Sequence, residues 1–354
     1  MPLRFCLIGA GFWAHYQLAA WQELPDAVCV AVCDCDASKA AALAARFGVE
    51  GVFDDVERML ERTRPDFVDI VASPAAHPEL VRLAAAHGIA VICQKPLADS
   101  AHAAQALLAA CQAAGVPLLV HENFRWQAPI RAAKAILDRQ AIGAVFRARI
   151  QFVCSFPVFD NQPFLRRQRR FIISDVGTHL LDVSRFLFGE FSSVYCRAQK
   201  INPGIAGEDV ATLMLTMAQG GTVLCELSYA SRTEYERFPE TFLFVEGSEG
   251  SLELVRNCQL RLTNSAGTQV TEAGPPHYTW ADPAYEVVHG SIVDCQRNLL
   301  AHLSGLSQAE TTAEDNLHTL RLVDAAYQSA DTGHAIQLPR PSNSVEKPAL
   351  GKCR

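Results

Sequence analysis

The stretch Leu3-Arg-Phe-Cys-Leu-Ile-Gly-Ala-Gly-Phe-Trp-Ala14 decides the fold of this chain. Its first six residues form a short apolar run of strand type, and a helical pattern follows. The rest reads G-x-G-x-x-A, in which Gly9 permits a tight turn and Gly11 lets the backbone approach a pyrophosphate. Ala14 is small enough for close packing of helix on strand. The stretch therefore predicts a phosphate-binding turn at a helix amino terminus.

The next apolar run, Val28 to Cys33, ends at Asp34, which lies 25 residues after Gly9. An acid at this place accepts hydrogen bonds from both ribose hydroxyls of NAD. No arginine follows before Arg46, so a 2′-phosphate would meet Asp34 without a nearby cation. We therefore predict NAD rather than NADP. The alternative is that Asp34 only caps the helix expected from Ala37 to Phe47.

Helical and strand patterns continue to alternate up to residue 121, which predicts an α/β fold with a parallel, doubly wound sheet. Ligands of such sheets bind beyond the carboxyl ends of the strands. The ends expected here are Gly9, Asp34, Ser73-Pro74, Gln94-Lys95-Pro96 and His121-Glu122-Asn123.

Lys95 lies at one of these strand ends, where its ammonium can stabilise the alkoxide that develops on an alcohol near a nicotinamide. The alternative is an ordinary solvated lysine. Asp175 and His179 are four residues apart in a helix expected to end near Phe188, so the spacing predicts that they share one face. A neutral histidine can accept a hydroxyl proton, and Asp175 either orients it or contacts the substrate hydroxyl. The alternative makes His179 a histidine paired with acids for stability.

Three motifs in order, the G-x-G-x-x-A turn, Gln94-Lys95-Pro96 and Asp175-Val-Gly-Thr-His179-Leu-Leu-Asp182, resemble the Gfo/Idh/MocA family of sugar and cyclitol oxidoreductases. The resemblance covers about residues 3 to 340. The family usually has Glu-Lys-Pro, so Gln94 removes a charge beside the lysine. The resemblance implies that Lys95, Asp175 and His179 form the catalytic group and that the chain forms a homodimer or homotetramer. Asp182 is expected to be mainly structural, because Arg185 is close to it on the same helix.

The expected contacts divide into two groups. Cofactor contacts are predicted for Gly9, Gly11, Phe12, Trp13, Ala14, Asp34, Ser73, Pro74, His77, Gln94 and Lys95. Substrate contacts are predicted for Lys95, Asn123, Arg125, Trp126, Arg166, Asp175 and His179. For His77 helix capping is the alternative, for Arg125 an interdomain salt bridge, and for the basic run Arg166 to Arg170 a solvated loop.

From Val145 the apolar pattern changes to period two, which predicts a largely antiparallel sheet backed by the Asp175 helix and by helices near 286–303 and 314–330. Met214 and Leu224 are expected on the less buried side of this sheet, in agreement with an oligomer interface. The predicted domains are residues 1–123 for NAD binding and 124–340, of α+β type, for substrate binding and assembly. The tail 341–354 is predicted to be disordered.

Composition excludes several classes of protein. The 354 residues include 31 Lys plus Arg and 38 Asp plus Glu, and this net charge of −7 is not that of a typical nucleic-acid-binding protein. The uncharged runs contain glycine, histidine or glutamine, so no membrane span is expected. The 12 cysteines form no C-x-x-C pair, which argues against a metal site and favours the reducing cytoplasm.

The sequence thus predicts an NAD-dependent dehydrogenase that transfers hydride from a hydroxyl-bearing carbon of a free sugar or polyol to nicotinamide. An anomeric hydroxyl would give a lactone. Two alternatives stay open: an NAD-dependent glycosidase, which would hold and recycle its NAD, and a non-catalytic nicotinamide-binding regulator. The joint presence of Lys95 and His179 argues against the regulator.

Overall fold

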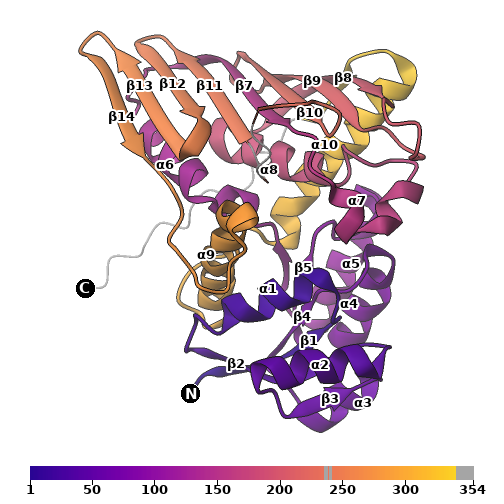
Figure 1. Ribbon diagram of the computed structural model, residues 1–354. Coiled ribbons are helices and arrows are strands. Elements are labelled where there is room, and N and C mark those ends of the chain that lie inside the picture. Colours follow the sequence, from indigo (N-terminus) through magenta and orange to yellow (C-terminus); the bar gives the residue numbers. More distant parts are fainter. Residues whose placement is uncertain (235–237, 239–240, 340–354) are drawn as a thin grey trace, which may run out of the picture.

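The computed structural model describes residues 1–234, 238 and 241–339. One β-sheet is built within residues 3–121, and the second lies above it in Figure 1 and is built mostly from residues 145–272. The tail predicted to be disordered, from Pro341 onward, lies outside the described residues. Within the described part of the chain, no helix is long and apolar enough to cross a membrane.

The first sheet has six parallel strands in the order β3-β2-β1-β4-β5-β6. The strands are β1 (Leu3–Ile8), β2 (Ala27–Cys33), β3 (Gly51–Phe53), β4 (Phe67–Ile70), β5 (Ala90–Gln94) and β6 (Leu118–His121). The helices around it are α1 (Phe12–Trp21), α2 (Ala37–Phe47), α3 (Val56–Thr63), α4 (His77–Ala86) and α5 (Ala101–Ala114). The predicted doubly wound fold is confirmed. No predicted range covered β3, whose three residues are too few to show a pattern.

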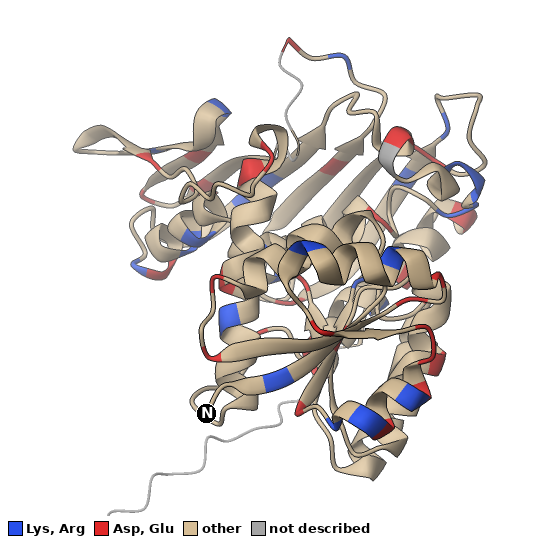
Figure 2. Cartoon of the chain, turned by 60° about the horizontal axis from the view of Figure 1, so that its bottom comes forward, with Lys and Arg blue, Asp and Glu red and all other residues tan. Residues whose placement is uncertain are grey.

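Strand β1 shows why this sheet is apolar at consecutive positions. Phe5 and Leu7 belong to the core shared with α1 and α2, whereas Cys6 and Ile8 belong to the core shared with α3, α4 and α5. A strand that is covered on both faces needs apolar residues throughout. In Figure 2, lysine, arginine and acidic residues are interspersed over the outer surfaces of this domain.

Most helix starts in this domain are capped by side chains. Asp36, Asp55 and Ser100 accept hydrogen bonds from backbone amides in the first turns of α2, α3 and α5. Helices α1 and α4 have no side-chain cap, and the N-cap residue of α1 is Gly11. The first amides of α1 therefore remain available to a ligand.

The second sheet has nine strands in the order β14-β13-β12-β11-β7-β10-β9-β8-β15. They are β7 (Val145–Val153), β8 (Phe191–Gln199), β9 (Val210–Met217), β10 (Thr222–Ser228), β11 (Thr241–Gly247), β12 (Gly250–Val255), β13 (Gln259–Asn264), β14 (Gly267–Glu272) and β15 (Ile336–Gln337). Strands β7 and β10 pair in parallel, and the other described pairs are antiparallel. The predicted ranges omitted β13, β14 and β15. All six residues of β14 are exposed, so it has no buried face to produce a pattern.

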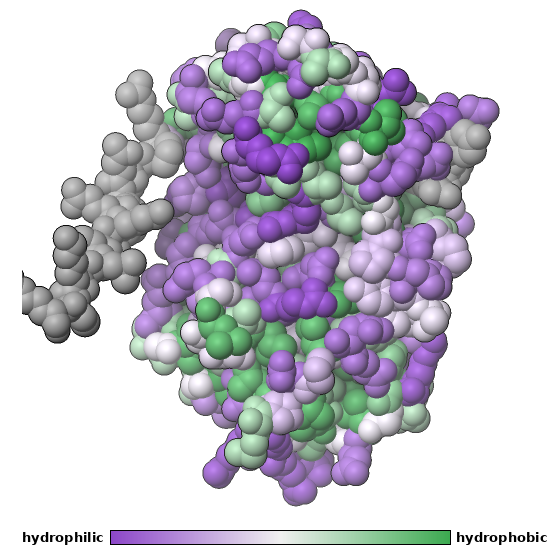
Figure 3. Space-filling view, turned by 90° about the vertical axis from the view of Figure 1, so that its left-hand side faces the viewer, coloured by the Kyte–Doolittle hydropathy of each residue, from purple (hydrophilic) through white to green (hydrophobic). Residues whose placement is uncertain are grey.

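Helices cover one face of this sheet and leave the other open (Figure 1). The covering helices are α6 (Ala128–Asp138), α8 (Val176–Phe188) and α10 (Ala313–Thr332). The open face carries the ion pairs of Arg147 with Glu246 and of Arg149 with Glu226. It also exposes Met214, as the sequence predicted, while Leu224 is half-buried. On the side of the molecule shown in Figure 3, hydrophobic and hydrophilic residues are interspersed.

The remaining helices are the short α7 (Val158–Asn161) and the long α9 (Glu286–Leu303), with one-turn helices at Pro74–Ala76 (η1), Phe124–Trp126 (η2), Pro163–Arg167 (η3), Arg256–Cys258 (η4) and Pro283–Tyr285 (η5). Although α9 follows the second sheet in sequence, it packs against α1 and joins the core of the first sheet. Helix α10 contacts both α5 and β8. These contacts hold the carboxyl edge of the first sheet beside the start of α8.

Candidate active site

The first feature of the site is the turn between β1 and α1. Gly9 has a φ angle of 102°, and a Cβ atom there would lie 2.8 Å from backbone atoms of Val71 and Ala72. A residue with a side chain cannot be accommodated without strain. At Gly11 the opposite holds, because a Cβ would meet no atom within 4 Å. The turn is thus closed toward the sheet and open on the side where a pyrophosphate would approach the amides of α1.

Asp34 lies beside this turn at the end of β2. Its carboxylate accepts hydrogen bonds from the amides of Ala10, at 2.7 Å, and Asp36, at 2.9 Å. The alternative, in which Asp34 caps α2, is wrong, because Asp36 is the cap and accepts from Ser38 N at 3.0 Å. Asp34 is half-buried, and its position at the turn suits a ribose contact.

The other expected cofactor contacts lie at different depths. Phe12 is exposed, Ala14 is fully buried against the sheet, and Trp13 is partly buried with its ring 5.9 Å from that of His289. Ser73 is exposed and begins the turn into η1, where Pro74 is half-buried. The contacts of these residues with NAD stay predictions.

His77 requires a correction. Its side chain is fully buried, and its two ring nitrogens lie 2.9 Å from Pro96 O and 3.1 Å from Ala72 O. The imidazole therefore neither caps α4 nor is free to contact a cofactor. Instead it ties the turn after β4 to the turn that contains Lys95.

Lys95 and Asp175 form the first polar pair of the site. Lys95 Nζ lies 3.0 Å from Asp175 Oδ1 and 3.2 Å from Asp175 O. Each side chain is 17% exposed, so the pair is shielded but remains reachable by a small molecule. The end of β5 and the start of α8, which are 80 residues apart in sequence, bring the two groups together.

His179 forms a second pair, with Glu122 rather than with Asp175. His179 Nδ1 contacts Glu122 Oε1, and the ring stacks on Phe124 with centroids 3.8 Å apart and planes 4° apart. The prediction that Asp175 orients His179 is therefore wrong. Asp175 is the N-cap of α8, with φ −93° and ψ −85°, so helical spacing does not apply to it.

Glu122 is the residue that the sequence reasoning missed as a site member. It directly follows β6, and its place at the carboxyl edge was the signal that could have identified it. It is fully buried, and burial raises the pKa of its carboxyl to about 7. Burial also lowers the pKa of His179 well below its usual value, with Lys95 acting in the same direction. His179 is therefore neutral at ordinary pH and able to accept a proton.

Gln94 lies beneath Lys95 in a chain of buried polar groups. Its Nε2 donates to Gln17 Oε1 at 3.0 Å and lies 3.2 Å from His121 Nδ1. Gln17 in turn donates to Asp69 at 3.0 Å. Burial lowers the pKa of His121 to about 3 and raises that of Asp69 to about 6. The neutral Gln94 can donate to two acceptors here, which a glutamate carboxylate cannot.

Arg125 is a structural residue, and its predicted substrate contact is wrong. Its Nε and Nη2 donate to the two oxygens of Asp182 at 2.8 and 2.5 Å, and Nη2 also reaches Asp315 at 2.8 Å. Nη1 donates to the carbonyl oxygen of Glu310 at 3.1 Å. The guanidinium is thus engaged by Asp182, Asp315 and the Glu310 carbonyl. It forms a salt bridge, as the alternative stated, but within residues 124–340 rather than between the predicted domains.

The neighbours of Arg125 are also engaged. Asn123 is buried and donates to Ser291 Oγ at 2.8 Å, and Trp126 is covered by the guanidinium of Arg131, 4.3 Å from its ring centroid. Neither side chain joins the Lys95–His179 group. Arg166 is exposed and stacks over Phe159 at 4.8 Å.

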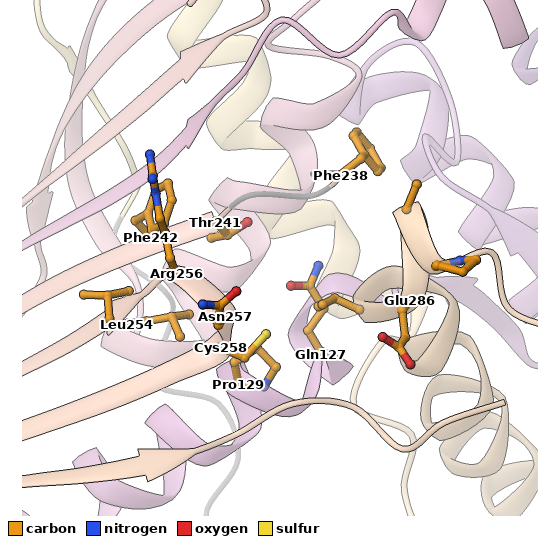
Figure 4. Close-up of a pocket in the computed structure, with 14 residues that line it drawn as sticks. Gln127, Pro129, Phe238, Thr241, Phe242, Leu254, Arg256, Asn257, Cys258 and Glu286 are labelled. Carbon is orange, nitrogen blue, oxygen red and sulfur yellow. The ribbon is translucent and has the colours of Figure 1, made fainter. Parts of the chain in front are cut away.

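A separate cavity of about 50 Å³ lies between β11, β12 and the start of α9, and Figure 4 shows the residues that line it. Gln127 and Thr241 point toward this space, and within the described part of the chain Gln127 Nε2 and Thr241 Oγ1 have no hydrogen-bond partner. No predicted catalytic or cofactor residue lines the cavity. We therefore place the active site at the sheet edge with Lys95, Asp175, His179 and Glu122.

This geometry is that of an oxidoreductase that binds a dinucleotide at the edge of a parallel sheet. The family model described as "Oxidoreductase family, NAD-binding Rossmann fold" matches residues 3–122, and "GFO/IDH/MocA C-terminal domain" matches residues 130–253. A D-apiose dehydrogenase of Paraburkholderia graminis is 43% identical over 97% of this chain and 91% of that protein. The chain belongs to the Gfo/Idh/MocA family of oxidoreductases, as its motifs predicted.

Two further relatives cover nearly the whole chain. A D-apiose dehydrogenase of Rhizobium rhizogenes is 39% identical over 95% of this chain and 97% of that protein. The crystal structure of an oxidoreductase from Agrobacterium radiobacter, in complex with NAD+, L-tartaric acid and magnesium, is 38% identical with a TM-score of 0.93, and the match covers 95% of this chain and 98% of that one. The predicted fold class and family are confirmed.

Proposed function

We propose that this protein oxidises a hydroxyl group of a free sugar or polyol with NAD, and that D-apiose is the substrate to test first. The proposal rests on one observation. The Lys95–Asp175 ion pair and the neutral His179 lie together at the carboxyl edge of the NAD-binding sheet. The names of the two relatives above support the sugar. So do the segments 11–16, 94–96 and 121–126, whose sequences resemble D-apiose dehydrogenases. If the anomeric hydroxyl is oxidised, the product is a lactone.

The residues around the turn after β1 fit the cofactor. We expect the pyrophosphate to lie over Gly11 at the amides of α1 and the ribose hydroxyls to donate to Asp34; the open space at Gly11 and the position of Asp34 beside the turn support this. When bound there, NAD supplies the acceptor for the hydrogen and electron pair that leave the substrate carbon. Asp34 also argues against NADP, because its carboxylate would face the extra phosphate.

In the proposed reaction Lys95 and His179 act on the same hydroxyl group. The Lys95 ammonium, held by Asp175, contacts the alcohol oxygen and stabilises the negative charge that develops on it. Neutral His179 accepts the hydroxyl proton. Lys95 is held by Asp175, and His179 is held by Glu122 and Phe124, which limits the reorganisation needed at the moment of reaction.

Several predictions made from the sequence remain part of the proposal. We place the protein in the cytoplasm, where its buried thiols would stay reduced, and assign domains 1–123 and 124–340. We also propose a homodimer or homotetramer formed through the open face of the second sheet, where Met214 and Phe244 are 48% and 38% exposed. Small-molecule substrates, and not nucleic acids, are the expected partners.

The test is the appearance of reduced-nicotinamide absorbance with NAD, and then NADP, across free aldoses, cyclitols and D-apiose. Lys95→Ala and His179→Ala are assayed alongside. Turnover on one sugar class that both substitutions abolish supports the proposal. Bound NAD without net reduction by any sugar contradicts it and favours the NAD-dependent glycosidase or the regulator.

A further inference from the structure

We infer that Glu122 is the residue that positions His179 for the reaction: its carboxylate holds the Nδ1–H group of the ring and leaves Nε2 as the atom that takes the substrate proton. This inference rests on the function proposed above. It adds a residue from the strand edge of the NAD-binding sheet to the Lys95, Asp175 and His179 group that the sequence predicted.

The contacts of the ring support this role. Glu122 and His179 are 57 residues apart in sequence and meet through the Nδ1–Oε1 contact. Burial raises the pKa of Glu122 to about 7, so above that pH its carboxyl is ionised and only accepts hydrogen bonds. Nδ1 then carries the hydrogen, and Nε2 has a free lone pair. The parallel stack on Phe124 restricts tilting of the ring, and the Glu122 contact restricts its rotation. Two independent contacts therefore fix one orientation and one tautomer.

The carboxylate of Glu122 is available to hold the His179 ring, because it is not paired with a lysine or arginine among the described residues. It is fully buried, and its second oxygen, Oε2, has no hydrogen-bond partner among the residues that the structure describes. In contrast, the carboxylate of Asp175 is bound to Lys95, and that of Asp182 is bound to Arg125. Glu122 is thus the acid that contacts the His179 ring directly.

The charges around the pair come from four elements. Lys95 after β5 and Arg125 in η2 are the cations that act on Glu122, and Asp315 in α10 is the opposing acid. Asp175 and Asp182, at the start and within α8, act on His179 together with Lys95, and the neutral His121 precedes Glu122. Lys95 is paired with Asp175, and Arg125 is paired with Asp182 and Asp315, so Glu122 is the acid of this group that pairs with the His179 ring.

The proton balance of the step follows from this arrangement. The substrate O–H bond breaks and an Nε2–H bond forms, while the carbon loses a hydrogen and an electron pair to NAD and becomes a carbonyl carbon. The ring becomes cationic, and the adjacent Glu122 carboxylate neutralises that charge. Without the carboxylate, a buried imidazolium would lack a direct anionic partner and the proton transfer would be less favourable.

The test compares Glu122→Gln with Glu122→Asp. Glutamine keeps the shape and an acceptor oxygen but loses the charge, so we expect kcat to fall by about 100-fold or more, with the KM for the sugar and the Kd for NAD changed less than about threefold. The low-pH limb of the kcat/KM profile should move to lower pH, because removing the anion lowers the pKa of His179. Glu122→Asp should keep the limb and recover part of kcat.

Asp209→Asn is the matched control. Asp209 is 2% exposed, and its carboxylate accepts hydrogen bonds from the amides of Ile201 and Asn202 in the segment between β8 and β9. Replacing its carboxyl by an amide shows how much stability is lost when any buried acid is altered in this way. We expect it to change stability while leaving the pH profile of kcat/KM unmoved.

A second measurement is independent of turnover. Nitrogen-15 NMR of labelled histidine, with His179→Gln used for assignment, should show His179 of the wild-type protein as the Nδ1–H tautomer. An Nε2–H tautomer, or a Glu122→Gln enzyme with wild-type kcat and pH profile, would overturn the inference. If Glu122→Gln does not fold, Glu122→Asp and the wild-type spectrum decide. A wild-type enzyme that oxidises no sugar contradicts the proposed function, while the spectrum still tests Glu122.

Discussion

Replacing Arg125 by methionine tests the buried ion-pair network that joins η2 to α8 and α10. The side chains of Arg125 and Asp182 are 6% and 0% exposed, and Asp182 would keep only the Thr319 hydroxyl at 3.2 Å and the more distant Arg185 at 4.0 Å. Leaving a buried carboxylate without its partner costs about 3–5 kcal/mol. We therefore expect Arg125→Met to lower the free energy of unfolding by that amount at pH 8.

The pH dependence of this loss separates charge from packing. Burial already raises the pKa of Asp182, and removing Arg125, the main opposing charge, raises it further. A carboxyl whose pKa is higher in the folded than in the unfolded state favours folding at low pH. This advantage disappears as the pH rises through the folded pKa. The destabilisation of Arg125→Met should therefore be smaller at pH 5 than at pH 8.

The assay is urea unfolding followed by circular dichroism at both pH values. Arg170→Met is the control, because the Arg170–Asp331 pair is 57% and 67% exposed and should change stability by less than about 1 kcal/mol. Arg125→Met with Asp182→Leu should recover much of the loss by replacing the pair with apolar groups. A loss below about 1 kcal/mol at pH 8, or an equal loss at both pH values, would refute the reasoning.

Four other substitutions probe the turn after β1 and the Lys95 segment. Gly9→Ala should destabilise the protein by about 1–3 kcal/mol in urea because its Cβ meets the backbone, whereas Gly11→Val should leave stability unchanged and raise the Kd for NAD at least tenfold by calorimetry. The reverse pattern would contradict the assignment of the two glycines. Gln94→Glu buries an acid beside neutral His121, so stability should fall as the pH rises, and a pH-independent urea midpoint would count against this. Lys95→Met should lower kcat about 100-fold or more with intact folding, and near-wild-type kcat would remove Lys95 from the mechanism.

The fold of the first sheet follows from local features of the sequence. The apolar run of β1 is buried on both faces, and the N-caps Asp36, Asp55 and Ser100 precede α2, α3 and α5. Strand β14 could not be predicted in this way, because its exposed residues pair only at the edge of the second sheet. An edge strand of this kind depends on its neighbour rather than on its own pattern.

At the site, sequence reasoning identified the right segments but not all the pairs. Lys95 was expected at the carboxyl edge, and it lies there against Asp175. The regular i,i+4 rule nevertheless assigned Asp175 to His179, and it failed because Asp175 is outside the helical turn. Arg125 has the hydrogen-bond donors that suit a sugar and follows a strand end, so it was predicted to contact the substrate. Only its buried ion pair with Asp182 shows that it is structural.

The sequence by itself determined the turn at Gly9 and Gly11, the acid at Asp34 and the position of Lys95 at a strand end, because each depends on a few adjacent residues and on the regular geometry of a βαβ unit. Only the tertiary structure decided which acid holds His179. The two candidates, Asp175 and Glu122, lie on α8 and after β6, and their distances to the ring depend on how α8 docks against the sheet edge. That docking is set by the packing of α9 and α10 over both sheets, which no local pattern encodes.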